Sequence, residues 1–250
     1  MSFTAAYLGA IPVDAIHLGA QQVWTAEPVD PYTGAVLDDN PVGFWPLNET
    51  EGTTATDASG NGNHGTYTGT PTLASATVLG RTCPDFDGAN DYVACPAIEL
   101  PVGSFTLEVV ARMDSYVTEG TILGERMVDG RSFAAIGTHI GSYSGQGGTL
   151  SAGGYYGGGN WVTISDGTWT AGAIHHAVYT QDGTTATLYV DGTLIGSRTV
   201  TVLASNNGWD IGAGHSRTTF WNGPIAAAAL YDTALPAGRV TAHYGALTGV

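Results

Sequence analysis

FTLEVVARM, residues 105–113, alternates between two kinds of side chain. Every second position is apolar: Phe105, Leu107, Val109, Ala111 and Met113. The positions between them include Thr106, Glu108 and Arg112. A period of two places alternate side chains on opposite faces of a β-strand. This stretch therefore predicts a strand with one apolar, buried face and one polar face.

Similar alternating runs recur along the chain and end at dipeptides that favour tight turns. IHHAVYT (174–180) precedes Asp182-Gly183, and ATLYV (186–190) precedes Asp191-Gly192. Asp-Gly occurs five times and Asn-Gly three times, and these pairs supply the positive φ that hairpin turns need. Many short strands at such spacing predict an all-β sandwich. One helix is expected, over LPAGRVTAHY at 235–244, where a proline occupies the first turn.

The charge of the chain excludes two classes of partner. Its 250 residues include 22 acidic and 7 basic side chains, for a formal net charge of −15. Nucleic acids and anionic membranes both attract basic surfaces, so neither partner is expected. No run of about 18 or more apolar residues exists, so we expect no membrane insertion. The apolar start is interrupted by Pro12, Asp14 and His17, which is not typical of a secretory signal.

Residues 6–24, AYLGAIPVDAIHLGAQQVW, contain the same pattern twice, ten positions apart. The alternation predicts two strands, 6–8 and 15–18, that form a β-ribbon arm within residues 1–24. A two-stranded ribbon is too small to be stable alone, so we expect it to join a neighbouring sheet or its own copies. The arm residues proposed for this contact are Tyr7, Leu8, Val13, Ile16, Leu18, Val23 and Trp24.

The next segment, TAEPVDPYTGAVLDDNP at 25–41, differs in composition from the rest of the chain. It has three prolines, four acidic residues and no sustained period. These features predict a proline-rich linker. The sandwich domain is then expected over residues 42–250.

Five motifs, in order along the chain, carry a resemblance to one family. They are FWPLNETEGTTATDASGNGNHGTYTG (44–69), FDGANDYVACP (86–96), SFTLEVVARMDS (104–115), GAIHHAVYTQDGTTATLYVDGTLIGS (172–197) and GPIAAAALYDTALPAGRV (223–240). Together they resemble laminin G-like domains of the concanavalin A-like lectin/glucanase superfamily, over roughly residues 42–246. The resemblance implies a two-sheet antiparallel jelly-roll sandwich that serves mainly as a binding module, often for glycans. VDAIHLGAQQVW (13–24) resembles short segments of structural proteins of tailed bacteriophages.

The resemblance implies a calcium loop in DASGNGNHG, where Asp57 and carbonyls near Asn63 and His64 would supply oxygen ligands. Calcium prefers hard oxygen ligands, and glycines let the backbone fold carbonyls toward one point. The alternative is an Asx-type turn in which Asp57 bonds its own backbone. Family members commonly have an acidic Ile-Asp-Glu sequence near the C-terminus, whereas this chain has Ile-Ala-Ala at 225–227. The sequence is therefore compatible with either a bound calcium ion or no cofactor at all.

The two cysteines lie in CPDFDGANDYVAC. A hairpin centred on Ala89 would place Cys83 opposite Cys95, at a separation that permits a disulfide. We expect this bridge, with two reduced, buried thiols as the alternative. His175 and His176 are adjacent, so on a strand they point to opposite faces and a structural role is expected rather than a shared metal ion.

Catalysis is not expected. Glucanase-like members of the superfamily carry acids in the pattern Glu-x-Asp-x-x-Glu on one strand, and no such run occurs here; Glu108 stands alone. No nucleophile elbow, zinc-protease motif or phosphate loop occurs either. Aromatic residues in or beside glycine-rich loops are the candidate glycan surface, with core packing as the alternative for each: Tyr155, Tyr156, Trp161, Trp169, Trp209 and Trp221.

Taken together, these features predict a virion structural protein, either a phage minor tail protein or a surface decoration component. The arm would bind other tail subunits, and the sandwich would bind a host cell-surface glycan. A homo-oligomer, with a trimer as the expected form, would assemble in the host cytoplasm. The alternatives are a non-viral bacterial surface or secreted carbohydrate-binding module, and a purely architectural domain without a free ligand.

Overall fold

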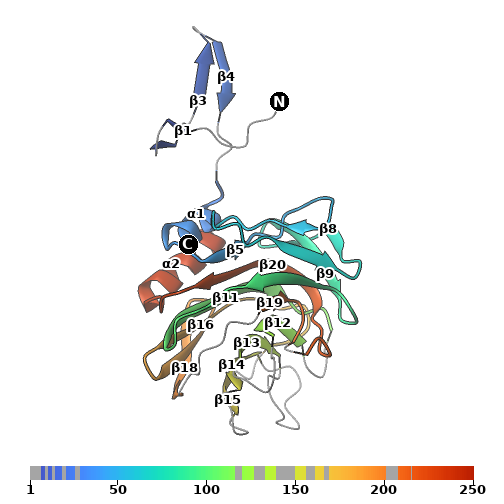
Figure 1. Ribbon diagram of the computed structural model, residues 1–250, viewed down its shortest axis with the longest axis vertical. Coiled ribbons are helices and arrows are strands. Elements are labelled where there is room, and N and C mark those ends of the chain that lie inside the picture. Colours follow the sequence, from blue (N-terminus) through green and yellow to red (C-terminus); the bar gives the residue numbers. More distant parts are fainter. Residues whose placement is uncertain are drawn as a thin grey trace.

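A computed structural model gives the structure of the protein over residues 7–8, 11–12, 15–18, 21–25, 29–115, 120–126, 133–138, 150–155, 161–165, 169–200, 208–214 and 216–250. Over these residues, strands make up two large sheets, and two short helices accompany them (Figure 1). All pairings within the two sheets are antiparallel. The predicted all-β jelly-roll sandwich is confirmed.

The first sheet contains β6 (Thr54–Ala55), β7 (Gly65–Thr68), β10 (Tyr92–Ala97), β12 (Gly120–Glu125), β13 (Phe133–Thr138), β14 (Leu150–Tyr155), β15 (Trp161–Ser165) and β19 (Gly208–Ile211). Its order is β15-β14-β13-β12-β19-β10-β7-β6. The second sheet contains β5 (Gly43–Trp45), β8 (Thr72–Val78), β9 (Arg81–Asp87), β11 (Ser104–Arg112), β16 (Ile174–Asp182), β17 (Thr185–Val190), β18 (Thr193–Thr199) and β20 (Asn222–Tyr231). Its order is β18-β17-β16-β11-β20-β9-β8, and β5 also pairs with β20.

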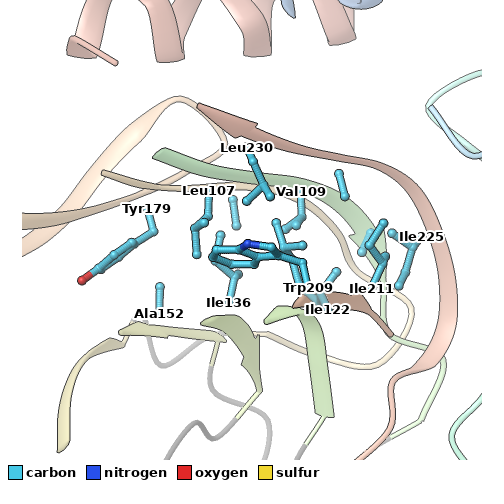
Figure 2. Close-up of a cluster of buried hydrophobic side chains, with 14 of the residues drawn as sticks. Leu107, Val109, Ile122, Ile136, Ala152, Tyr179, Trp209, Ile211, Ile225 and Leu230 are labelled. Atoms are coloured by element: carbon cyan, nitrogen blue, oxygen red, sulfur yellow. The ribbon is translucent and has the colours of Figure 1, made fainter. Parts of the chain in front are cut away.

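The main hydrophobic core lies between the two sheets. The five apolar positions of the stretch 105–113 all belong to it, as the alternation predicts. Trp209 of the first sheet lies among Leu107 and Val109 of the second (Figure 2). Burial of such large apolar side chains is the main favourable contribution to folding.

The other face of β11 is also buried, which the sequence did not predict. Thr106, Glu108 and Val110 are fully shielded from solvent. The reason is that two helices, α1 (Pro31–Asp38) and α2 (Ala237–Thr248), cover this outer face of the second sheet (Figure 1). A smaller hydrophobic cluster fills the layer between the helices and the sheet.

Helix α1 lies inside the segment predicted as a linker, so that prediction is wrong for residues 31–38. Asp30 caps the helix by accepting a hydrogen bond from the backbone N–H of Thr33 at 3.1 Å, and a proline follows at the first position. Tyr32 and Val36, four residues apart, are buried against the sheet. Helix α2 confirms the helix expected near the C-terminus and ends at Gly249, whose φ of 79° suits glycine.

The doubled N-terminal sequence forms two hairpins, not one ribbon. Strand β1 (Tyr7–Leu8) pairs with β2 (Ile11–Pro12), and β3 (Ala15–Leu18) pairs with β4 (Gln21–Thr25). Each copy of Leu-Gly-Ala joins the strands of its own hairpin, so the predicted pairing of the two copies is wrong. The hairpins lie away from the sandwich, on the side of α1 (Figure 1). Val13 lies outside the described residues, and the other arm residues are described by their backbone.

Within the described part of the chain, none of the helices has the length and apolar character needed to cross a membrane.

Candidate functional site

The predicted calcium loop is held together by hydrogen bonds of its own. Oδ1 of Asp57 accepts from the backbone N–H groups of Phe44 and Ser59, both at 2.9 Å. Oδ2 accepts from the hydroxyl of Ser59 and from the N–H of Asn63, both at 2.8 Å. Burial opposes ionisation of Asp57, but these bonds hold the pKa of its carboxyl below the usual value. The loop is thereby fixed to β5.

The other proposed calcium ligands are engaged in the same way. Nδ1 of His64 accepts the N–H of Asp57 at 3.1 Å, and the carbonyl of Asn63 accepts the indole N–H of Trp45 at 3.0 Å. Calcium needs six to eight free oxygen ligands. Among the described residues, no group of three or more His, Cys, Asp or Glu is placed to hold a metal ion. The bonds of Asp57 to the backbone of Ser59 and Asn63 match the Asx-turn alternative, and calcium binding stays a prediction.

Three of the proposed glycan-binding tryptophans belong to the core. Trp169, Trp209 and Trp221 are at most 1% exposed. The indole N–H of Trp209 donates to the carbonyl of Ile98 at 3.1 Å, and its ring lies in the middle of the core (Figure 2). The glycan-surface prediction is wrong for these three, because their size favours burial between the sheets.

The other proposed aromatic residues lie at the edge of the first sheet. Tyr155 and Trp161 are described by their backbones, which pair between β14 and β15. Tyr156 lies outside the described residues.

The predicted disulfide is also wrong. Cys83 lies in β9 and Cys95 in β10, which belong to different sheets, and both thiols are free and buried. The turn between them is a crossover from one sheet to the other, not a hairpin. Burial raises the pKa of the Cys83 thiol to about 11.

A cleft of about 310 Å³ lies at this crossover. Its lining comes from the ends of β9 and β11, the starts of β8 and β20, and the loops beside them: Thr70, Thr72, Asp85, Phe86, Asp87, Asp91, Asp114 and Asn222. Four carboxylates, two hydroxyls, one amide and one aromatic ring thus converge on one hollow. Seven of the eight lining residues are polar, so a ligand in this hollow would be held mainly by hydrogen bonds.

Hydrogen bonds fix the polar groups of the cleft in place. Oδ1 of Asp87 accepts from the backbone N–H groups of Ala89 and Asn90 at 2.8 and 3.0 Å. Oδ1 of Asp91 accepts from the N–H of Thr70 at 2.7 Å. Gly69, next to it, has a φ of 80°, and a Cβ there would lie 2.3 Å from that same oxygen. The close approach of this loop to Asp91 therefore requires glycine.

The charges of Arg112 and Asp114 also act on the cleft. The guanidinium of Arg112 pairs with Asp114, with Nε 2.6 Å from Oδ1 and Nη2 3.0 Å from Oδ2. Burial and the nearby charge of Asp114 raise the pKa of the Asp85 carboxyl. The described lining therefore presents mainly hydrogen-bond acceptors with negative charge.

The sequence did not lead us to expect this cleft, although three of its aspartates lie close together in the sequence. Asp85, Asp87 and Asp91 lie within seven residues, in the stretch between the two cysteines. Three closely spaced acids in a turn are a sign of backbone capping or of a polar site. The contributions of Asp114 and Asn222 depend on the topology, so local spacing does not reveal them.

A second polar cluster surrounds Glu108, in the layer between the second sheet and the helices. Its buried carboxylate accepts from the hydroxyls of Tyr32 and Tyr231, at 3.0 and 2.7 Å. It also accepts from Nε2 of His176 at 2.8 Å and Nδ1 of His243 at 3.0 Å. Burial opposes its charge, but the two histidines hold the pKa of Glu108 well below its usual range.

The neighbouring histidine points the other way, as expected for adjacent strand residues. Nδ1 of His175 lies 2.8 Å from Oδ2 of Asp191, and its ring packs edge-on against Trp169. The two histidine rings therefore contact different carboxylates, His175 that of Asp191 and His176 that of Glu108, while the backbone N–H of His176 also donates to Asp191.

Comparison with known proteins identifies the fold. A family model described as the concanavalin A-like lectin/glucanases superfamily matches residues 87–241. No curated protein matches the chain. Domain 4 of AbnA, an extracellular GH43 arabinanase from Geobacillus stearothermophilus solved with arabinotriose, is similar, with 16% identity and a TM-score of 0.63. The similarity covers 82% of this chain and 98% of that domain.

Two further structures share the sandwich. The binding domain of Paraclostridial Mosquitocidal Protein 1 has 16% identity and a TM-score of 0.59, over 84% of this chain and 52% of that one. Trypanosoma rangeli sialidase has 15% identity and a TM-score of 0.58, over 81% of this chain and 32% of that one. The chain therefore spans about half of the first and a third of the second, and the likeness is one of fold.

Proposed function

The chain belongs to the concanavalin A-like lectin/glucanases superfamily, and from this premise we propose that its sandwich binds a carbohydrate in the cleft beside Asp85. The observation that carries the proposal is the set of fixed oxygen acceptors that line one hollow of about 310 Å³. Sugar hydroxyls are hydrogen-bond donors, and bonds to carboxylates are roughly twice as strong as neutral ones. The volume lies at the lower end of the range of about 300–1,000 Å³ for small-molecule sites, which suits a short saccharide.

The charge of the cleft narrows the class of sugar. Four aspartates line it, and the chain as a whole carries a formal charge of −15. Uronic and sialic acids would meet like charge, which costs affinity and slows association. We therefore assign a neutral glycan to this cleft. The arabinotriose bound to domain 4 of AbnA is a neutral oligosaccharide on the same fold, which supports this choice.

We propose that the protein binds this glycan without cleaving it. Glu108 is fully buried, and Asp57 is engaged by four hydrogen bonds, so neither reaches a glycosidic bond in solvent. Within the cleft, Asp87 and Asp91 are held by backbone N–H groups. A retaining glycosidase instead needs one acid that gives up its proton and a second that is free to attack.

We further propose that the protein is a component of a phage tail or virion surface. The support is the sequence 13–24, which resembles tailed-phage structural proteins, and the two small hairpins of the arm, the second of which this sequence forms. Hairpins of this size are unstable alone, so they are expected to join tail subunits in a homo-oligomer, with a trimer as the expected form. Assembly would take place in the host cytoplasm, and the sandwich would contact a host surface glycan.

Calorimetric titration with neutral and acidic oligosaccharides tests the binding proposal. Neutral saccharides are expected to bind wild type, and Asp85→Asn is expected to weaken binding about tenfold or more, because a charged acceptor is lost. Asp182→Asn, at an exposed turn far along the chain, is the matched control and should bind as wild type. Equal affinity of Asp85→Asn and wild type, or release of reducing ends during the titration, would contradict the proposal.

Deletion of residues 1–25 tests the virion proposal separately. The truncated chain is expected to keep its glycan affinity and to be missing from purified phage particles. Normal incorporation of the truncated chain would refute the assignment of the arm. A full-length protein found on bacterial surfaces without particles would favour the alternative, a non-viral surface or secreted carbohydrate-binding module.

A further inference from the structure

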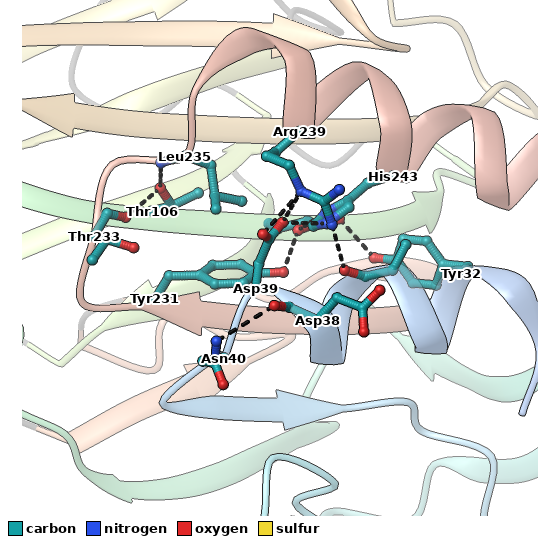
Figure 3. Close-up of polar contacts among 12 residues, drawn as sticks. Tyr32, Asp38, Asp39, Asn40, Thr106, Tyr231, Thr233, Leu235, Arg239 and His243 are labelled. Atoms are coloured by element: carbon teal, nitrogen blue, oxygen red, sulfur yellow. Dashed lines mark hydrogen bonds and ion pairs between the residues drawn. The ribbon is translucent and has the colours of Figure 1, made fainter.

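Helix α1 is the segment that joins the N-terminal hairpins to the sandwich. It is only eight residues long and contains Gly34, so it is not stable as an isolated helix. Its position depends on side-chain contacts with the sandwich and with α2. These contacts converge on His243 of α2 (Figure 3).

His243 lies between two carboxylates, one on each side of its ring. Nδ1 is 3.0 Å from Oε2 of Glu108, on the second sheet. Nε2 is 2.9 Å from Oδ2 of Asp39, at the end of α1. The ring itself is fully buried. Glu108 only accepts hydrogen bonds, so Nδ1 needs a proton. The contact of Nε2 with Asp39 is an ion pair, which is favourable only when the ring carries its positive charge.

His176 provides an internal comparison in the same cluster. Only its Nε2 meets a carboxylate, that of Glu108 at 2.8 Å. Its Nδ1 has no hydrogen-bond partner among the described residues. Nε2 of His243 has no hydrogen-bond partner either, but it lies 2.9 Å from Oδ2 of Asp39, so the contact between them is an ion pair. A neutral imidazole with one N–H satisfies this arrangement, whereas the arrangement around His243 requires the imidazolium.

The charged and titratable groups that surround His243 come from every element packed against it. They are Glu108 of β11, His176 of β16, Tyr231 of β20, Tyr32 of α1, Asp39 after α1, and Arg239 of α2 itself. The charges of Glu108 and Asp39 are balanced by those of Arg239 and the imidazolium. Removal of one proton from His243 leaves a buried lone pair that faces a carboxylate.

We propose that His243, as an imidazolium, is a proton-dependent latch that holds α1 against the sandwich, and that loss of its proton loosens α1. Because α1 directly follows the hairpins, the latch sets how firmly the arm is joined to the glycan-binding domain. This device is independent of the cleft and of any ligand.

The sign of the pH dependence follows from the neighbouring charges. Burial opposes the charge of the ring, but Glu108 and Asp39 together raise the pKa of His243 above its usual value. Opening of α1 removes Asp39 but leaves Glu108 beside the ring, so the pKa of His243 is higher when α1 is closed than when it is open. The latch is complete below the pKa of the open form and is lost as the pH rises through the pKa of the closed form. Between these two values, opening of α1 becomes about tenfold more favourable per pH unit.

Hydrogen exchange of the full-length protein between pH 6 and 9 tests the latch. After correction for the intrinsic pH dependence of exchange, protection of the α1 amides is expected to fall by up to about tenfold per pH unit between the pKa of His243 in the open form and its higher pKa in the closed form. Amides of β11 and β16 should stay protected. Constant protection of α1 across this range in wild type would overturn the proposal, whatever the variants do.

Variants separate the latch from the other contacts of α1. His243→Gln is expected to lower α1 protection at pH 6 and to abolish its pH dependence. His175→Gln removes a different histidine–carboxylate pair and should keep the wild-type profile. Arg239→Gln loosens α1 at every pH but keeps the dependence, whereas Asp39→Asn removes both contacts and the dependence. Wild-type pH dependence in His243→Gln would refute the proposal.

Discussion

Replacement of Glu108 by alanine tests how the helices are held to the sandwich. The carboxylate is fully buried and accepts four side-chain hydrogen bonds, from two tyrosine hydroxyls and two histidine rings. Glu108→Ala leaves these donors without their acceptor and removes one of the two carboxylates beside the buried ring of His243. Removal of one partner of a buried ion pair costs about 3–5 kcal/mol. In a domain of this size, that corresponds to a loss of roughly 6–20 °C in Tm.

Thermal unfolding followed by circular dichroism at pH 6.5 measures this loss. Glu108→Gln keeps the shape and one acceptor oxygen, so its Tm is expected between those of wild type and Glu108→Ala. Glu99→Ala changes an exposed glutamate and should unfold within about 1 °C of wild type. A Tm of Glu108→Ala within about 2 °C of wild type would refute the account of this cluster.

Three more outcomes are expected. Native protein at pH 8 should not react with a thiol reagent, whereas denatured protein should show two reduced thiols, because Cys83 and Cys95 are buried and unpaired; thiol counting by absorbance checks this. Neither calcium nor a chelator is expected to change the Tm, because both oxygens of Asp57 already accept hydrogen bonds. A rise in Tm on addition of calcium would instead support a calcium site at Asp57. Trp209→Ala should cost about 3–5 kcal/mol in urea unfolding, whereas Trp209→Phe should keep the glycan affinity, which calorimetry measures.

The strands and turns followed from local sequence patterns. The alternation in 105–113 placed five apolar side chains in the core, because a strand has a fixed period of two. Asp-Gly pairs at 182–183 and 191–192 likewise lie in turns between paired strands. These features depend on neighbours in the sequence, so a single chain reveals them.

The errors concern contacts between segments far apart in the sequence. Helix α1 depends on contacts such as that of Tyr32 with Glu108, 76 residues away, and no local pattern shows that partner. The predicted hairpin between the cysteines is wrong, because β9, which contains Cys83, and β10, which contains Cys95, belong to different sheets. The cleft depends on the same crossover, which brings Asn222 beside Asp87.

The repeat at the N-terminus is visible in the sequence, but its structural unit is not: the repeated unit is a whole hairpin and not a single strand. The alternation predicts that the two copies pair as strands of one ribbon, whereas each copy lies in a hairpin of its own. The Gly-Ala pair in each copy indicates a hairpin, because glycine favours the tight turns of hairpins that have two-residue loops. The repeated unit is therefore a hairpin, and the arm has two of them.

NMR titration of the labelled protein with a neutral oligosaccharide tests the central claim most directly, since it locates the binding surface without any variant. The account predicts that saturable shift changes centre on the backbone amides of residues 70, 72, 85–87, 91, 114 and 222, which line the cleft. Changes centred on β14 and β15, or no changes at saccharide concentrations that saturate known lectins, would contradict the claim that this cleft binds a glycan.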